Sequence, residues 1–267
     1  TRLVSDWSSD VCSSDLYAPP ASCAGCHADI ANKYKTTGMA RSFVNARPGA
    51  LLENLNVPPF LHKPSGRYYQ LQQRDGRLYE ASWTAAPPGV ESQRIEREVH
   101  YIMGSGNHAR TYLHRTSAGK LIELPLGWYA ESGGTFAMSP GYDRRDHPGF
   151  TRAIPDECMF CHNGYPALPA QSRAHGADAT FPASLPQGID CQRCHGPGQA
   201  HIDAASSKRP PDEIRRHILN PKRLSAERQL EVCMQCHLES TSRALPYAIT
   251  RFTREPYSYR PQEPLAN

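Results

Sequence analysis

Eight of the nine cysteines belong to four copies of one pattern, in which two cysteines stand three positions apart and a histidine follows the second. The cysteines are Cys23, Cys26, Cys158, Cys161, Cys191, Cys194, Cys233 and Cys236. The histidines that follow them are His27, His162, His195 and His237. On a helix, positions i, i+3 and i+4 share one face. Two thiols and an imidazole on such a face can attach one porphyrin through thioethers and ligate its iron. The pattern, which is that of c-type haem attachment, predicts four covalently bound haems c.

Two other kinds of cysteine site fit this pattern less well. Zinc ribbons pair their C-x-x-C units across about 15–20 residues, and every interval between the motifs here is longer. A zinc site also has no need of a histidine directly after each second cysteine. A thioredoxin-like redox pair occurs once, within a βαβ pattern. We therefore expect haem at all four motifs, rather than structural zinc or a redox dithiol.

Eight further histidines are candidates for the second axial position of each iron. They are His62, His100, His108, His114, His147, His175, His201 and His217. Four irons take at most four of them, so the alternative for each is an ordinary hydrogen-bonded or exposed histidine. We favour His201, because the break at Gly196-Pro197-Gly198 lets the chain present it to a neighbouring haem. His108 follows the Gly-rich segment Gly104-Ser105-Gly106-Asn107 and is the next candidate.

The remaining candidates have weaker signals. His62 and His147 are each flanked by Pro or Gly turns and are also considered ligands. Met39 lies twelve residues after His27 and is either a thioether ligand of the first iron or a core methionine. The other four histidines fall in strands, where they can face solvent, or in polar stretches; they are His100, His114, His175 and His217.

The elements that must position these residues can be read from turn signals and alternation. Strands are expected at 66–73, 77–83, 93–102, 110–115 and 120–129, with a hairpin at Asp75-Gly76 and a turn at Ser117-Ala118-Gly119. Helices are expected at 199–207 and at 225–239, the latter with Ser225 as N-cap and Glu227 in its first turn. These elements predict an irregular α+β fold, with short haem-bearing helices around a four-haem cluster and a β-rich insert at 55–142.

Length and composition are those of a loop-rich globular chain. The 267 residues suggest one large domain or two small ones. The net charge is +4 and the basic residues are scattered, which argues against nucleic-acid binding. No segment has the roughly 18 uncharged apolar residues of a membrane-spanning helix. The apolar fraction is modest, so we expect something besides aliphatic packing to help hold the fold together.

The two ends of the chain differ from the rest. Residues 1–16 lack the basic and apolar regions of a signal peptide, and Asp6–Leu16 resembles the translation of a sequencing adapter. We expect a non-native leader there, which would make Cys12 spurious, the alternative being a disordered leader rich in Ser and Asp. Residues 17–245 are expected to form the haem-binding module. The Pro-rich segment 246–267 is expected to be extended and truncated.

Several segments of the chain resemble the multihaem cytochromes c related to the tetrahaem electron carrier of nitrifying bacteria. The resemblance covers about 17–265 and rests on 23–43, 104–108, 112–113, 139–143, 191–201 and 220–239. The similarity is greater to bacterial forms in which such a module precedes tetratricopeptide repeats. It implies a periplasmic or otherwise exported electron-transfer module with closely packed haems, redox partner proteins and a repeat region beyond this segment. Related carriers often have a histidine where this chain has Met39.

Electron transfer through four haems is therefore the function expected, with no catalytic residues assigned. One alternative is an enzyme, a multihaem reductase or oxidase of a small nitrogen or sulfur compound, which would need an iron with an open coordination position. A second alternative is a scaffold or sensor module that uses haems structurally and presents the β-rich insert to a partner.

Overall fold

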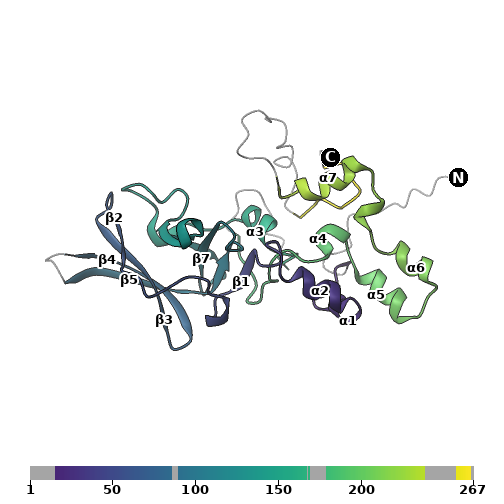
Figure 1. Ribbon diagram of the computed structural model, residues 1–267, viewed down its shortest axis with the longest axis horizontal. Coiled ribbons are helices and arrows are strands. Elements are labelled where there is room, and N and C mark those ends of the chain that lie inside the picture. Colours follow the sequence, from purple (N-terminus) through teal and green to yellow (C-terminus); the bar gives the residue numbers. More distant parts are fainter. Residues whose placement is uncertain (1–15, 86–89, 167, 169–178, 238–256, 266–267) are drawn as a thin grey trace. The chain divides into compact units, whose positions relative to one another are not determined.

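The computed structural model describes residues 16–85, 90–166, 168, 179–237 and 257–265 (Figure 1). The chain divides into two compact units. Asp29–Asp190 form one, which contains all the strands and is called the sheet unit below. Thr1–Ala28 together with Cys191–Asn267 form the other, the helical unit. Cys12, His175 and most of the predicted leader and tail lie outside the described residues.

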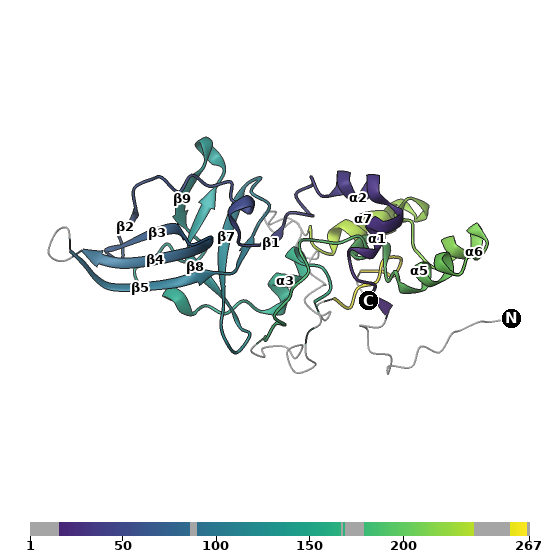
Figure 2. The same ribbon diagram turned by 90° about the horizontal axis from the view of Figure 1, so that it is seen from below.

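Two antiparallel sheets make up most of the sheet unit. The order of strands is β1-β6-β7-β8-β9 in one sheet and β2-β3-β4-β5 in the other, and Figure 2 shows β3, β4 and β5 side by side. The strands are β1 (Phe43–Asn45), β2 (Phe60–His62), β3 (Arg67–Arg74), β4 (Arg77–Ala85), β5 (Glu91–Val99), β6 (Tyr101–Met103), β7 (Ala109–Arg115), β8 (Leu121–Tyr129) and β9 (Thr135–Met138).

The strands expected from the sequence are present, except that one of them is divided into two. The strand predicted at 93–102 is two strands, because β5 and β6 belong to different sheets and the chain crosses between them at His100. The backbone N–H of His100 already donates to the carbonyl of Leu113 in β7. The strands β1, β2 and β9 were not predicted, because three or four residues are too few to show alternation.

The hairpin predicted at Asp75-Gly76 is confirmed. Both residues have positive φ, 51° and 73°, which is the conformation that a two-residue turn of type I′ requires. Arg74 and Arg77 are paired across it. The turn fixes the register of β3 against β4, so it also decides which side chains of these strands face the core.

An apolar core joins the two sheets. Tyr69, Leu71 and Leu78 from one sheet pack with residues of the other, among them Ile102, Tyr112, Leu124, Leu126, Trp128 and Met138. In β8 every residue from Leu121 to Trp128 is buried, so this strand is covered on both faces. Burial of apolar surface is the main driving force for folding, so the sheet unit has a core of its own.

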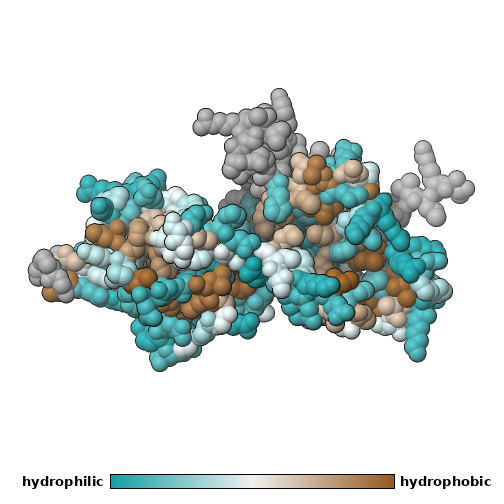
Figure 3. Space-filling view, in the orientation of Figure 1, coloured by the Kyte–Doolittle hydropathy of each residue, from teal (hydrophilic) through white to brown (hydrophobic). Residues whose placement is uncertain are grey.

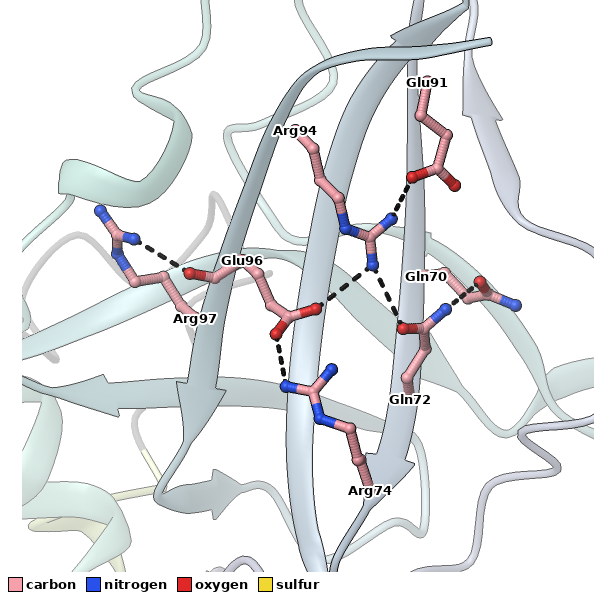
Figure 4. A network of polar contacts seen from close by, with 7 residues as sticks. All are labelled: Gln70, Gln72, Arg74, Glu91, Arg94, Glu96 and Arg97. Atoms are coloured by element: carbon pink, nitrogen blue, oxygen red, sulfur yellow. Dashed lines mark hydrogen bonds and ion pairs between the residues drawn. The ribbon is translucent and has the colours of Figure 1, made fainter. Parts of the chain in front are cut away.

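The other face of the four-stranded sheet is polar (Figure 4). Arg94 bonds Glu91 at 2.7 Å, Glu96 at 3.2 Å and Gln72 at 3.3 Å, and Arg74 bonds Glu96 at 2.7 Å. Opposite charges on neighbouring strands stabilise their pairing only modestly when they are exposed. This face is therefore suited to contact with water.

The helices of the described chain are short, and four of them carry residues of the cysteine motifs. The helices are α1 (Ser22–Cys26), α2 (Ala28–Tyr34), α3 (Asp156–His162), α4 (Gln192–His195), α5 (Gln199–Ser206), α6 (Pro211–Arg216) and α7 (Ala226–Met234). The predicted N-cap of α7 is confirmed, since the side chain of Ser225 accepts a hydrogen bond from the backbone N–H of Arg228. The helix ends at Met234, earlier than the predicted 239. The predicted helix at 199–207 corresponds to α5.

The expected mixture of α and β structure is thus confirmed, with antiparallel strands and short helices in separate parts of the chain. Of the helices in the described part of the chain, none combines the length and apolar character needed to cross a membrane.

One carboxyl group is buried in the core without a charged partner. Glu80 in β4 is fully buried, and its Oε1 accepts a hydrogen bond from the backbone N–H of Leu126 at 2.9 Å. Its Oε2 has no hydrogen-bond partner. Burial raises the pKa of Glu80 well above its ordinary value, and the nearby carboxylate of Glu123 raises it further. The folded chain therefore binds a proton here that the unfolded chain releases.

Replacement of Glu80 by glutamine should stabilise the protein at neutral and alkaline pH. The folded-state pKa is raised, so the wild type loses stability as pH rises from about 4.5 towards that pKa, by about 1.4 kcal/mol per unit of elevation. Glu80→Gln keeps the acceptor for Leu126 and removes the titration. Urea unfolding should show equal stability near pH 4.5 and a gain of at least about 1 kcal/mol at pH 8. Glu131→Gln, at an exposed position, is the control, and a Glu80→Gln variant less stable at pH 8 would contradict this account.

Candidate cofactor-binding sites

Each C-x-x-C-H motif is wound into a helical turn. In three motifs the backbone N–H of the histidine donates to the carbonyl oxygen of the first cysteine, at 2.9 Å for His27, 3.0 Å for His195 and 2.9 Å for His237. The remaining motif lies wholly within α3. A hydrogen bond from residue i to residue i−4 is that of an α-helix. In each motif the two cysteines and the histidine therefore lie on one helical face.

The structure holds the eight motif cysteines as thiols. Cys26 and Cys233 are exposed, and the other six are partly buried. Burial raises the pKa of the Cys158 thiol, and the negative charge of Glu123 adds to this. Cys158 is less accessible than the exposed cysteines. Its raised pKa also leaves less of it as the thiolate, which is the reactive form.

A glycine turn after the third motif positions His201. The φ of Gly196, +75°, lies in the left-handed region that favours glycine, and it ends α4. The buried amide of Gln192, between the cysteines of this motif, accepts hydrogen bonds from the backbone N–H groups of Gly198 at 3.0 Å and Ala18 at 2.9 Å. The same side chain donates to the Ala18 carbonyl at 2.8 Å. The chain then enters α5, which carries His201.

Two histidines of the helical unit are oriented by backbone carbonyls. Nδ1 of His195 lies 2.7 Å from the carbonyl oxygen of Leu219, and Nδ1 of His201 lies 3.0 Å from that of Ile214. A carbonyl can only accept, so these contacts place the proton on Nδ1 and leave Nε2 as the nitrogen that can bind a metal.

The imidazole of His201 lies nearly parallel to that of His27. The ring planes differ by 13° and the ring centroids are 6.4 Å apart. The first motif and the helix that follows the third motif are thus brought together within the helical unit. The Gly-Pro-Gly break suggested that His201 faces a neighbouring haem, and ligation of an iron by His201 stays a prediction; the sequence did not say which motif would lie beside it.

The second motif lies in the sheet unit, against the turn that contains Met39. The hydroxyl of Ser42 lies 2.8 Å from the carbonyl oxygens of both Met39 and His162. The side chain of Met39 is 42 % exposed. Its role as a ligand of the first iron, suggested by its sequence distance from His27, stays a prediction. Burial lowers the pKa of His162.

The two ligand candidates His62 and His147 have structural roles in the sheet unit. Nδ1 of His62 lies 2.8 Å from the hydroxyl of Ser65, and its Nε2 lies 3.3 Å from a carboxylate oxygen of Asp143. Nδ1 of His147 accepts from the backbone N–H of Gly149 at 3.1 Å, and its Nε2 lies 2.9 Å from the hydroxyl of Tyr69. Both nitrogens of each ring are engaged, so neither ring offers one to a metal as it stands.

The other candidate histidines are placed separately. His108 is exposed in the loop between β6 and β7, where its backbone carbonyl accepts from Ala130. His100 and His114, for which exposure to solvent was one possibility, are partly buried, with ring centroids 5.1 Å apart. His217 is exposed at the end of α6.

Among the described residues, no three His, Cys, Asp or Glu side chains converge in a way that could hold a metal ion by themselves. Such convergence is what a structural zinc site requires. No family model, no curated protein and no solved structure matches this chain.

Some residues that shape these sites left no signal in the sequence. Leu219 and Ile214 act through backbone carbonyls, which every residue has, so no residue type marks them. Gln192 occupies a spacer position of a motif that tolerates any residue. Its buried position and its three hydrogen bonds to the segment around Ala18 and to Gly198 appear only in the folded chain.

The cysteines of the cofactor-free chain should differ in reactivity. With limiting iodoacetamide at pH 7.5, Cys26 and Cys233 should be modified at least about tenfold faster than Cys158, whose pKa is raised by burial. Peptide mass spectrometry at timed intervals measures the three rates. In urea the rates should converge, and a Cys158 that reacts first in the folded chain would contradict the described geometry.

Proposed function

We propose that this chain is an electron-transfer protein that holds four covalently attached haems c. The observation that carries the proposal is that all four C-x-x-C-H motifs are wound into helical turns. This winding puts two thiols and one imidazole on a common face, as attachment of one porphyrin and ligation of its iron require. When bound, the haems supply one-electron redox chemistry, and the protein contributes ligation, burial and local charge.

The residues around the motifs fit such a group. The eight motif cysteines are not in disulfides with one another, so each is available for a thioether. Leu230 lies one helical turn before Cys233 and is 59 % exposed, and Figure 3 shows hydrophobic residues at the surface near α7. Exposed apolar side chains beside an attachment site are what a porphyrin face would cover.

His27 and His201 are the two histidines that we propose for the first iron. Their rings are nearly parallel with centroids 6.4 Å apart, so two imidazoles lie together at the first motif. The hydrogen bond from Nδ1 of His201 to the Ile214 carbonyl leaves Nε2 for the metal. An iron with both axial positions filled suits electron transfer better than catalysis, which needs an open position.

The proposal also includes the location of the protein and its partners. Covalent haem attachment of this kind implies the periplasm or another exported location, with redox proteins as partners. The motifs and their spacing support membership of the multihaem cytochromes c, including those fused to tetratricopeptide repeats. His62, His147 and His108 are not assigned to an iron in this proposal, and Met39 stays a candidate ligand of the first iron.

Purified protein from a host with a cytochrome c maturation system should contain four haems per chain. Replacing Cys233 and Cys236 together by alanine should lower this to three, because the thioethers of one haem are lost. The pyridine haemochrome assay with intact-mass measurement gives the count. Cys12→Ala, which lies outside every motif, should retain four haems. Wild-type protein without covalent haem would refute the proposal.

Replacement of His201 by alanine should convert one of the four haems from low spin to high spin. We expect the remaining three to be unaffected, since the His201 ring lies beside that of His27 in the first motif. Electron paramagnetic resonance and carbon monoxide binding measure the change, and His217→Ala is the matched control. An unchanged spectrum removes His201 as a ligand. A wild-type haem that is already high spin and binds nitrite or hydroxylamine would favour the enzyme alternative.

A further inference from the structure

The third and fourth motifs are joined by a buried arginine. Arg193 stands between Cys191 and Cys194, and its side chain is only 1 % exposed, the largest side chain of the described chain to be buried so fully. A guanidinium remains protonated in proteins, so this is a positive charge placed inside the helical unit. Burial of a charge is costly and needs compensating contacts.

The contacts of Arg193 lead to the fourth motif. Its Nη2 donates to the sulfur of Cys236 at 3.7 Å, and its guanidinium carbon lies 4.9 Å from the centre of the Tyr257 ring. Its backbone carbonyl accepts a hydrogen bond from the side-chain amide of Gln235 at 3.0 Å. Arg193 is a spacer residue of the third motif and contacts the fourth, and Gln235 is a spacer residue of the fourth motif and contacts the third. The positive charge of Arg193 therefore lies beside Cys236 of the fourth motif.

We infer that Arg193 sets the reduction potential of the haem attached at Cys233 and Cys236, raising it above the value that the ligands alone would give. The inference rests on the proposed function, since it requires a haem at the fourth motif. A fixed positive charge stabilises the form of the cofactor that has gained an electron. The effect is large where water is excluded, because the local dielectric constant is low and salt screens a buried charge little.

The redox step is the transfer of one electron. The haem of the fourth motif gains one electron from a reductant, which is a redox partner protein in the cell and dithionite in the experiment. No bond in the protein forms or breaks, and no proton moves at Arg193, because the guanidinium is protonated before and after. Arg193 therefore acts on the haem through its charge, and the quantity that reports its effect is the reduction potential of that haem rather than a reaction rate.

Spectroelectrochemical titration of the holoprotein, with each haem followed by electron paramagnetic resonance, tests this role. In Arg193→Gln, one haem should become at least tenfold harder to reduce, a fall of about 59 mV for one electron. The shift should persist between low and high salt. Arg193→Lys should restore most of the potential, and Arg216→Gln, at an exposed arginine of α6, should leave all four potentials unchanged.

A second measurement covers the case in which Arg193→Gln fails to load four haems. Burial lowers the pKa of a lysine, so in Arg193→Lys the potential of the same haem should fall as pH rises from 6 to 10, beyond any change in the wild type. The inference is overturned if Arg193→Gln with four haems keeps all its potentials, if all four shift equally, or if the lysine variant shows no such additional fall. Absence of haem from the wild type would instead refute the proposed function.

Discussion

Three side chains can hold one porphyrin only if the backbone brings them to one face within a single turn, and every motif of this chain satisfies that constraint. In three motifs the turn is closed by a hydrogen bond from the histidine N–H to the first cysteine carbonyl, and the remaining motif lies within α3. Helices this short are unstable on their own, because nucleation fixes several residues for each bond gained. The rest of the structure must therefore hold the turns in place. Gln192 does so through Ala18 and Gly198, and Leu219 does so at His195, with which it shares two hydrogen bonds.

The two units meet this demand by different means. The sheet unit has an apolar core between two sheets, so α3 and its motif can be attached to a scaffold that is stable by itself. Within its described residues the helical unit buries few apolar side chains, and the most buried of these residues include the polar Gln192, Arg193 and Gln235. Polar interiors need full hydrogen bonding to be stable. If haems are bound as proposed, their apolar faces supply the burial that the residues of this unit do not.

The histidines show how much the fold adds to the residue type. The same side chain is a member of a hydrogen-bonded cluster at His62 and His147, an exposed loop residue at His108, and the near-parallel neighbour of another imidazole at His201. Local sequence ranked these four by the turns around them. That ranking placed His201 first for a reason that the structure shares, since Gly196 does turn the chain. It had no means of detecting Tyr69 or Asp143, which occupy ring nitrogens from distant parts of the chain.

The sequence by itself determined what depends on neighbours along the chain. The spacing of Cys and His decides which groups share a helical face, Asp75-Gly76 decides the register of a hairpin, and Ser225 decides where α7 begins. Only the tertiary structure decided which motifs lie together, because that depends on contacts such as those from Arg193 to Cys236 and from Ser42 to His162. Those contacts join residues 43 and 120 positions apart, and no local pattern encodes a partner at such a distance.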